Sequence, residues 1–279
     1  MSNPRNQINS TIGAPVLKAV LIMVICLICV FPIIWTFLTS IKKPVDQFAM
    51  PPVWLFAPTA QNYINIFVKQ SFAKYFIDSF IISIFSTAII ILFGSLAAYS
   101  ISRYKAKGQM LANLVLVLRI LPPVAIILPI FILFKTYGLL DNYFGMIMLY
   151  SAFNLPFGIW LMIGFFQDLP VELEEAGLVD GCSRFKAMWK IIFPLSKPGL
   201  GASAILCLIQ CWNEYLFALV LCSFNVKTLP LGVAQFIQEH QILWGELTAA
   251  GICIMLPIFI FGMFIQKYLV RGLTVGAIK

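Results

Sequence analysis

The sequence predicts an all-α membrane protein with six transmembrane helices and both termini on the cytoplasmic side. Of its 279 residues, 61% are hydrophobic and 11% are charged, whereas about 25% of the residues in an ordinary soluble domain are charged. A soluble globule could not hide so much apolar surface behind so few charges. The composition therefore excludes a soluble enzyme, a disordered chain and a collagen-like fibre. Two further observations support the prediction: apolar runs long enough to span a bilayer, and an uneven distribution of lysine and arginine.

Six apolar runs divide the chain into spans and connecting segments. A helix needs about 20 apolar residues to cross a bilayer, and the first run is too long for the apolar part of a signal peptide. The expected spans are 19–41, 79–102, 111–134, 144–166, 199–221 and 247–265. The expected segments between them are a cytoplasmic N-terminus at 1–18, external loops at 42–78 and 222–246, a cytoplasmic hairpin at 167–198 and a cytoplasmic tail at 266–279, with residues 79–270 forming the core.

The positions of the basic residues predict the orientation, because cytoplasmic loops carry an excess of lysine and arginine. With the N-terminus inside, twelve of the 19 lysines and arginines lie on the cytoplasmic side, six lie outside, and Arg119 lies within a span. The cluster of Arg103, Lys105 and Lys107 is the strongest single indication. The net charge of +8 therefore reflects topology, and we expect no nucleic-acid partner.

The third span carries an arginine and three prolines. Arg119 is followed by Pro122 and Pro123, and Pro129 lies further along the run. Such breaks in a membrane helix are tolerated where neighbouring helices or a cavity satisfy the freed backbone groups. We expect this helix to line the protein interior, and a passive kink in a packed helix explains the pattern equally well.

The predicted hairpin at 167–198 is acidic in its first half and basic in its second half. Asp168 can cap a helix that opens at Pro170, and Ser183 can cap a second short helix that Pro194 ends. Such a pair is too charged to insert into the membrane. A loop longer than about 12–15 residues in a compact domain is usually functional, although a solvated connector remains the alternative.

Within this hairpin the chain reads EAGLVDG from Glu175 to Gly181, then nine residues, then IIFP from Ile191 to Pro194. The pattern resembles the EAA motif of ABC importer permeases, which reads E-A-A, three residues, G, nine residues, I-x-L-P. The spacing matches throughout, with Gly177 in place of the second alanine and Phe193 in place of leucine. The ending RGLTVGAIK, from Arg271 to Lys279, is similar to that of the carbohydrate-uptake permeases, the family of the smaller maltose permease subunit.

The resemblance implies a type I ABC importer permease fold in a cell inner (plasma) membrane, working within an assembly. The implied partners are a second permease subunit in a heterodimer, a dimer of ATPase subunits, an external substrate-binding protein, a carbohydrate substrate and membrane lipid. ATP and Mg²⁺ would bind to the ATPase, since this chain contains no G-x-x-x-x-G-K-[ST] sequence. We expect no cofactor, metal or catalytic residue on this chain. The resemblance assigns ATPase coupling to Glu175, Ala176, Gly177, Asp180, Gly181, Ile191 and Pro194.

Polar side chains within the spans are the candidates for a substrate pathway, because ionisable groups inside a membrane are usually functional. Neutral sugars bind to planar polar groups and aromatic platforms. The candidates are Arg119, Asn154, Trp212, Asn213 and Glu214, with Asp78 at the edge of the second span. The alternative is that they form hydrogen bonds between helices, each adding about 0.6–2 kcal/mol.

A glutamine-rich stretch lies in the second predicted external loop and contains Gln235, Gln238 and Gln241. In the maltose-type relatives, the corresponding loop probes the sugar site of the docked binding protein. The resemblance therefore suggests that role for this stretch, while an interfacial helix lying on the membrane explains it at least as well.

The predicted function is the permease subunit of an ATP-driven, binding-protein-dependent importer of a sugar or oligosaccharide, and not an enzyme. One alternative keeps the machinery and changes the cargo to a polyol, a glycerol phosphate or an amino sugar. Another class is a stand-alone secondary transporter, which would require inverted repeats and a relay of membrane-embedded carboxylates. Glu214 is the clear candidate for such a carboxylate, and the EAA-like spacing favours the importer.

Overall fold

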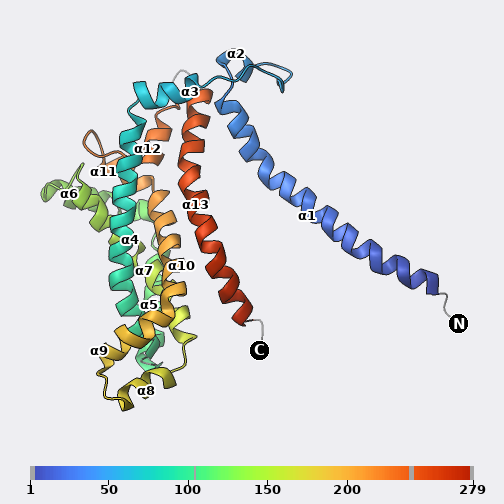
Figure 1. Cartoon of the computed structure of the whole chain (residues 1–279). Coiled ribbons are helices and arrows are strands. Elements are labelled where there is room, and N and C mark those ends of the chain that lie inside the picture. The colour runs from blue at the N-terminus through green and yellow to red at the C-terminus, as the bar shows by residue number, and fades with distance from the viewer. Residues whose placement is uncertain (1–3, 104, 239–241, 277–279) are drawn as a thin grey trace. The chain divides into compact units, whose positions relative to one another are not determined.

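The computed structural model describes residues 4–103, 105–238 and 242–276. The regular elements among these residues are helices. The β-type pairing in the described part of the chain is limited to an isolated antiparallel bridge between Ile237 and Ile242. The chain divides into two compact units, residues 1–70 with 236–253 and residues 71–235 with 254–279. The helices (Figure 1) are α1 (Pro4–Ser40), α2 (Pro44–Gln47), α3 (Gln61–Ile64), α4 (Phe72–Arg103), α5 (Lys105–Ile120), α6 (Pro123–Thr136), α7 (Tyr143–Gln167), α8 (Glu172–Val179), α9 (Arg184–Ala187), α10 (Phe193–Trp212), α11 (Leu216–Leu221), α12 (Leu229–Ala234) and α13 (Trp244–Gly276), with π-helical turns η1 (Asn65–Lys69) and η2 (Met188–Ile192).

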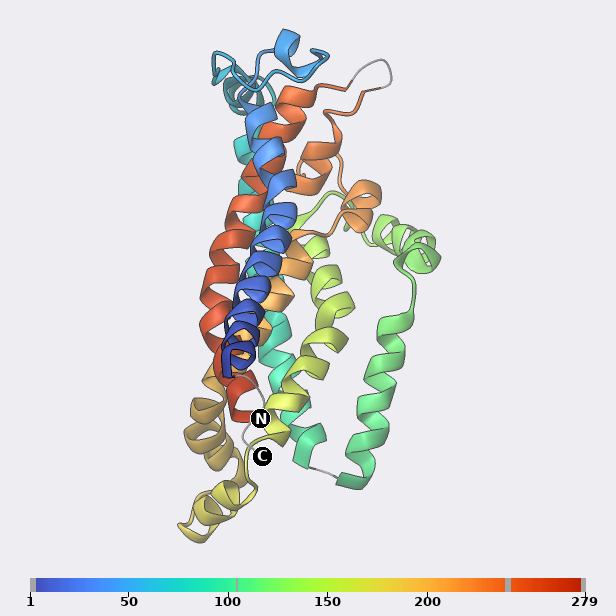
Figure 2. The same cartoon turned by 90° about the vertical axis from the view of Figure 1, so that its right-hand side faces the viewer.

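Helices α4, α7 and α10 form the centre of the second unit and lie side by side in both views (Figures 1 and 2). Small residues allow this close packing, as is usual where membrane helices associate. A Cβ added at Gly158 of α7 would lie 2.4 Å from Ile90 Cγ2 of α4 and 3.3 Å from Cys207 Sγ of α10. The buried core between the helices includes Met146 and Tyr150.

Two of the predicted spans are interrupted in the structure, and one of them is the span with the prolines. The span predicted at 111–134 is divided between α5 and α6, which are bent by 84°. Pro122 precedes α6 in an extended conformation, and proline has no N–H to continue a helix. The span predicted at 199–221 is divided between α10 and α11 at residues 213–215. The two segments beyond these breaks, α6 and α11, pack against each other.

The second half of the predicted hairpin also differs from its prediction. Ser183 caps α9 by accepting a hydrogen bond from the Lys186 N–H at 3.3 Å. The helix does not end at Pro194, however, because η2 leads the chain directly into α10. Pro194 lies in the first turn of α10, where its missing N–H is tolerated. The first helix of the hairpin begins at Glu172, and Asp168 ends α7 instead of capping α8.

The first unit consists of α1, the segment up to Gln70 and the first part of α13. Asn62 organises this unit by donating to the Ser40 and Lys42 carbonyls at 2.8 and 3.0 Å. Asn65 donates to Glu246 Oε1 at 2.9 Å. Gly245 allows the close approach, since a Cβ there would lie 2.5 Å from Asn62 Oδ1.

Five helical segments in the described chain are long and apolar enough to cross a membrane, or six if the bent α5–α6 pair is one span. In the first of them, the side chains from Leu17 to Phe31 are all exposed, as expected for a helix in contact with lipid or another subunit. The predicted placement of both termini in the cytoplasm remains a prediction.

Candidate functional site

Most of the coupling candidates lie on α8 and in the turn that follows it, while Ile191 lies in η2 and Pro194 in the first turn of α10. The turn after α8 is a Schellman motif, in which the Cys182 N–H donates to the Gly177 carbonyl and the Gly181 N–H to the Leu178 carbonyl, both at 3.0 Å. Gly181 has a φ of +82°, a conformation that side chains rarely adopt. Gly181 therefore fixes the sharp turn between α8 and α9.

Gly177 faces the second half of the hairpin and is buried. A Cβ at this position would lie 2.5 Å from Ile191 Cδ1 and 3.6 Å from the Ala187 Cβ. The small residue therefore allows α8 to pack closely on η2. The coupling role that the resemblance assigns to Gly177 stays a prediction.

Glu174 and Arg103 attach α8 to the end of α4. Glu174 Oε2 lies 3.1 Å from Arg103 Nε, and both side chains are largely buried. Glu174 Oε1 accepts a hydrogen bond from the Tyr99 hydroxyl at 2.6 Å, and Arg103 Nη1 donates to the Leu169 carbonyl at 3.2 Å. In the sequence, Glu174 is one acidic residue among several in the hairpin, and its distance along the chain from Tyr99 and Arg103 gives no local signal for this contact.

The opposite side of the hairpin is exposed. Glu175, Ala176 and Asp180 are all exposed. Two apolar side chains lie in the same segment, Val179 at 87% exposure and Phe185 at 67%. Charged and apolar groups exposed together on a short, firmly attached helix are typical of a surface that another protein covers.

Glu214 lies at the break between α10 and α11. Its carboxylate accepts hydrogen bonds from the Phe217 N–H at 2.8 Å, the Ala218 N–H at 3.3 Å and the Tyr150 hydroxyl. It therefore satisfies N–H groups at the start of α11 and ties them to α7. These contacts explain why a carboxylate lies inside a span, and they do not require that it bind a substrate.

The other pathway candidates lie in different surroundings. Asn154 is buried and donates to the Tyr150 carbonyl at 3.0 Å. Trp212 is buried and donates to the Ile254 carbonyl at 3.2 Å. The Arg119 guanidinium lies 4.4 Å from the centre of the Phe157 ring. Asn213 is exposed and donates to the Ile209 carbonyl at 3.0 Å.

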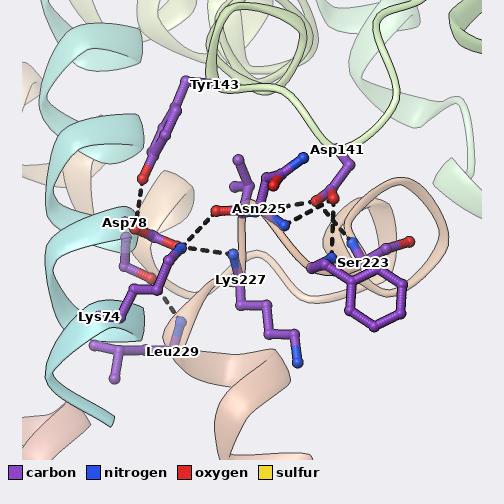
Figure 3. Close-up of polar contacts among 11 residues, drawn as sticks. Lys74, Asp78, Asp141, Tyr143, Ser223, Asn225, Lys227 and Leu229 are labelled. Carbon is purple, nitrogen blue, oxygen red and sulfur yellow. Dashed lines mark hydrogen bonds and ion pairs between the residues drawn. The ribbon is translucent and has the colours of Figure 1, made fainter. Parts of the chain in front are cut away.

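Asp78 is the centre of a buried polar cluster at the end of the second unit opposite α8 (Figures 1 and 3). Its carboxylate accepts from Lys74 Nζ and the Tyr143 hydroxyl, both at 2.6 Å, and from the Lys227 N–H at 2.9 Å. The neighbouring Ser79 Oγ accepts from the Leu229 N–H at 2.7 Å. The cluster thus holds the loop before α12 against α4 and α7.

Asp141 holds the other half of that loop (Figure 3). Its carboxylate accepts hydrogen bonds at 2.8–3.0 Å from the consecutive backbone N–H groups of residues 223–226. Partial burial acts to raise the pKa of Asp141, but these N–H groups lower it by more, to about 2 from an ordinary 3.8. Sequence reasoning missed Asp141, since an aspartate beside a glycine-containing turn is common.

The glutamine-rich stretch begins just beyond this loop. Gln235 is exposed, and its Oε1 accepts from the Tyr75 hydroxyl at 3.4 Å. Gln238 is exposed, and Gln241 lies outside the described residues. Within the part of the chain that the structure describes, no group of three or more His, Cys, Asp or Glu side chains could hold a metal ion.

Comparison with known proteins identifies relatives along nearly the whole chain. The family model described as "Binding-protein-dependent transport system inner membrane component" matches residues 90–275. The chain is 36% identical over 256 residues to the probable ABC transporter permease protein y4oR of Sinorhizobium fredii, with 92% of each chain covered. It is 34% identical over 273 residues to the trehalose/maltose transport system permease protein MalG of Thermococcus litoralis, with 95% of this chain and 98% of that one covered.

The fold is also that of a solved transporter. A chain in the crystal structure of a bacterial ABC transporter involved in alginate import matches with a TM-score of 0.76 and 23% identity, covering 96% of this chain and 99% of that one. The family match covers the hairpin and both broken spans, and it begins after Asp78 and Ser79 of the polar cluster. This chain therefore belongs to the binding-protein-dependent transport system inner membrane components, the permease subunits of ABC importers.

Proposed function

We propose that this chain is the permease subunit of an importer that takes up a sugar or oligosaccharide, driven by a separate ATPase. Relatives named for trehalose/maltose, sulfoquinovosyl glycerol and trehalose transport support a carbohydrate cargo. The sulfoquinovosyl glycerol relative is also compatible with a substituted polyol as cargo. The family membership argues against a stand-alone secondary transporter.

The observation that carries the coupling part of the proposal is the two-sided hairpin. Its inner side is fixed to the permease through Gly177 and through Glu174 with Arg103. Its outer side leaves Glu175 and Asp180 exposed. A carboxylate on an exposed helix can accept charge-assisted hydrogen bonds from a partner protein. The ATPase would therefore contact the outer side, while the inner side transmits the movement.

The movement has a continuous helical route into the membrane domain. The helical path from Arg184 to Trp212 passes from the hairpin through η2 into α10. It ends at the break near Glu214, beyond which α11 packs on α6. We infer that a displacement of the hairpin shifts these broken segments and so alternates access to the pathway. The ATP and Mg²⁺ would remain on the ATPase.

The remaining partners follow from the same proposal. A second, different permease would complete the pathway, and an external binding protein would deliver the cargo. A related transporter has been crystallised with an alginate pentasaccharide-bound periplasmic protein. In this chain, the loop held by Asp78 and Asp141 leads towards the glutamine-rich stretch, which we propose as part of the surface that contacts the binding protein.

The test is uptake of radiolabelled maltose and trehalose by proteoliposomes that contain the complete transporter. We expect Glu175→Lys to reduce ATP-driven uptake at least tenfold, a loss of about 1.4 kcal/mol or more in coupling. The reason is that a cation replaces the carboxylate that we propose contacts the ATPase. Glu172→Lys, also exposed on α8, is the matched control and should retain uptake. Uptake by Glu175→Lys that continues undiminished without ATP would overturn the proposal.

A further inference from the structure

A cavity of about 320 Å³ lies in the first unit, just beyond the end of α1. It is lined by the last turns of α1, by α2 with the loop after it, and by the first residue of α13. Trp35, Phe48 and Trp244 provide aromatic walls, and Lys42 and Asp46 provide charges of opposite sign. None of these residues belongs to the proposed pathway or to the coupling hairpin.

Lys42 is the unusual feature of this cavity, because its side chain is 3% exposed. Its ammonium lies 4.8 Å from the centre of the Trp35 ring and 5.1 Å from that of Phe56. Among the described residues, no carboxylate or other acceptor bonds to it. An ammonium has three N–H donors, and cation–π contacts do not occupy these donors, so they remain available to a ligand in the cavity. The cavity therefore presents a cation that lacks an anionic partner.

The backbone around Lys42 is held in place before any ligand arrives. The Lys42 carbonyl accepts hydrogen bonds from Gln47 Nε2 at 2.9 Å and Asn62 Nδ2 at 3.0 Å. The Trp35 ring packs edge-on against Trp54, with centroids 5.2 Å apart. A preorganised site loses less entropy when it binds, so this arrangement suits a ligand site better than a mobile loop does.

Asp46 restricts the charge of the ligand that this cavity can bind. A simple anion beside Lys42 would also meet the Asp46 carboxylate in the same small cavity, and like charges repel. A ligand that carries both an anionic and a cationic group satisfies both residues. Aromatic walls further favour an ammonium group.

The surroundings of the cavity indicate a membrane surface. The candidate span Leu17–Ser40 ends at the cavity, and tryptophans concentrate where a span meets water. The loop beyond α2 exposes large apolar side chains, including Met50 at 95%, Trp54 and Leu55. Exposed apolar groups of this kind mark contact with a protein or a membrane, and their place at the end of a candidate span favours the membrane. A sugar delivered from water would not require them.

We propose that this cavity binds the zwitterionic headgroup of a membrane phospholipid, with its phosphate at Lys42 and its amine at Asp46. The proposal goes beyond the transport function and does not depend on the nature of the cargo. The acyl chains would lie along the exposed apolar side chains of α1.

Native mass spectrometry of the complete transporter tests this site, with phosphatidylethanolamine, phosphatidylglycerol and maltose as separate probes. We expect the wild type to prefer phosphatidylethanolamine to phosphatidylglycerol. Lys42→Gln should weaken phosphatidylethanolamine binding at least tenfold, a loss of about 1.4 kcal/mol or more. Lys43→Gln, which changes the neighbouring exposed lysine, should leave binding unchanged. Asp46→Asn should reduce the preference for phosphatidylethanolamine while leaving Lys42 in place.

Three results would overturn the proposal. The wild type could bind both lipids equally, Lys42→Gln could behave like Lys43→Gln, or maltose could bind in a Lys42-dependent way and identify a saccharide site instead. The measured mass of each complex reports whether the variant has assembled. If Lys42→Gln fails to assemble, Asp46→Asn decides the outcome, because an unchanged lipid preference in that variant contradicts the assigned role of its carboxylate.

Discussion

Asp141 concentrates the hydrogen bonds of a whole loop on one side chain. Its own backbone adopts a φ of +54°, and its N–H donates to the Leu221 carbonyl at 2.8 Å. This conformation directs the carboxylate towards the N–H groups of residues 223–226. A neutral side chain in the same place could not attract all of these donors equally, because hydrogen bonds to a charged acceptor are the stronger ones.

The loss of stability on replacing Asp141 should therefore depend on pH in a defined direction. The pKa of Asp141 is about 2 in the folded protein and 3.8 ordinarily, so its carboxylate stabilises the fold above about pH 4 and loses that effect as the pH falls towards 2. We expect Asp141→Asn to lower the unfolding free energy by about 1–2 kcal/mol at pH 7. Thermal unfolding of both proteins in detergent between pH 7 and pH 3 measures the difference.

The difference between the two proteins should stay constant from pH 7 to about pH 5 and shrink below about pH 4. Ser223→Ala serves as the control, since Asp141 contacts the backbone of Ser223 and not its side chain. A difference that is independent of pH down to pH 3 would show that the charge of Asp141 does not hold the loop.

Neighbouring glutamates on α8 have opposite surroundings that the sequence did not distinguish. Glu174 is buried against Arg103 and Tyr99, whereas Glu175 is exposed. The EAA-like spacing predicts coupling positions, but it does not show which of them face the permease and which face outward. The contacts of Glu174 join residues 71 or more positions apart, and pairing over that distance leaves no local pattern.

At the scale of helices, the hairpin and α10 behave as one continuous element. The predicted stop at Pro194 was wrong, since a proline in the first turn of a helix needs no N–H partner. The chain passes from α9 into α10 through η2. A π-helical turn allows this, because its hydrogen bonds span one residue more than those of an α-helix. By contrast, the first helix of the hairpin, α8, is held on α4 by side-chain contacts.

Loss of the Glu174–Arg103 pair should therefore loosen α8. In Glu174→Gln, the Arg103 guanidinium remains largely buried without its anion, which costs about 3–5 kcal/mol for a buried pair. We expect trypsin to cut the hairpin at Arg184 and Lys186 at least tenfold faster in this variant, because cleavage follows the population of the open form. Glu172→Gln, at an exposed position, should be cut at the wild-type rate, and equal rates in both variants would contradict the anchoring role.

At the scale of the whole molecule, composition and hydropathy predicted the helical membrane fold, and the match with the solved transporter confirms it. The EAA-like hairpin and the C-terminal ending indicated the family, and the family match over residues 90–275 confirms that. The breaks at residues 213–215 and around Pro122 were harder to place. Both segments beyond the breaks are at least as apolar as the helices before them, and α6 and α11 pack on each other. The polar residues at these breaks indicated that the helices are irregular there, but they did not predict the direction in which the chain continues. For Glu214, the local backbone contacts support the alternative of a structural role.

The orientation of the whole chain is the remaining prediction from the basic residues, and the structure provides a matched pair of positions to test it. Val179 in the hairpin and Phe224 in the loop held by Asp141 are each 87% exposed in this chain. In the permease produced without its ATPase, cysteines placed there therefore differ in side and not in local access. The predicted topology places Val179 in the cytoplasm and Phe224 outside. In intact spheroplasts, a membrane-impermeant maleimide should label Phe224→Cys above the parent protein and leave Val179→Cys at the parent level. Val179→Cys should gain labelling only after permeabilisation, and the reverse order would invert the topology and with it the assignment of the hairpin to an ATPase.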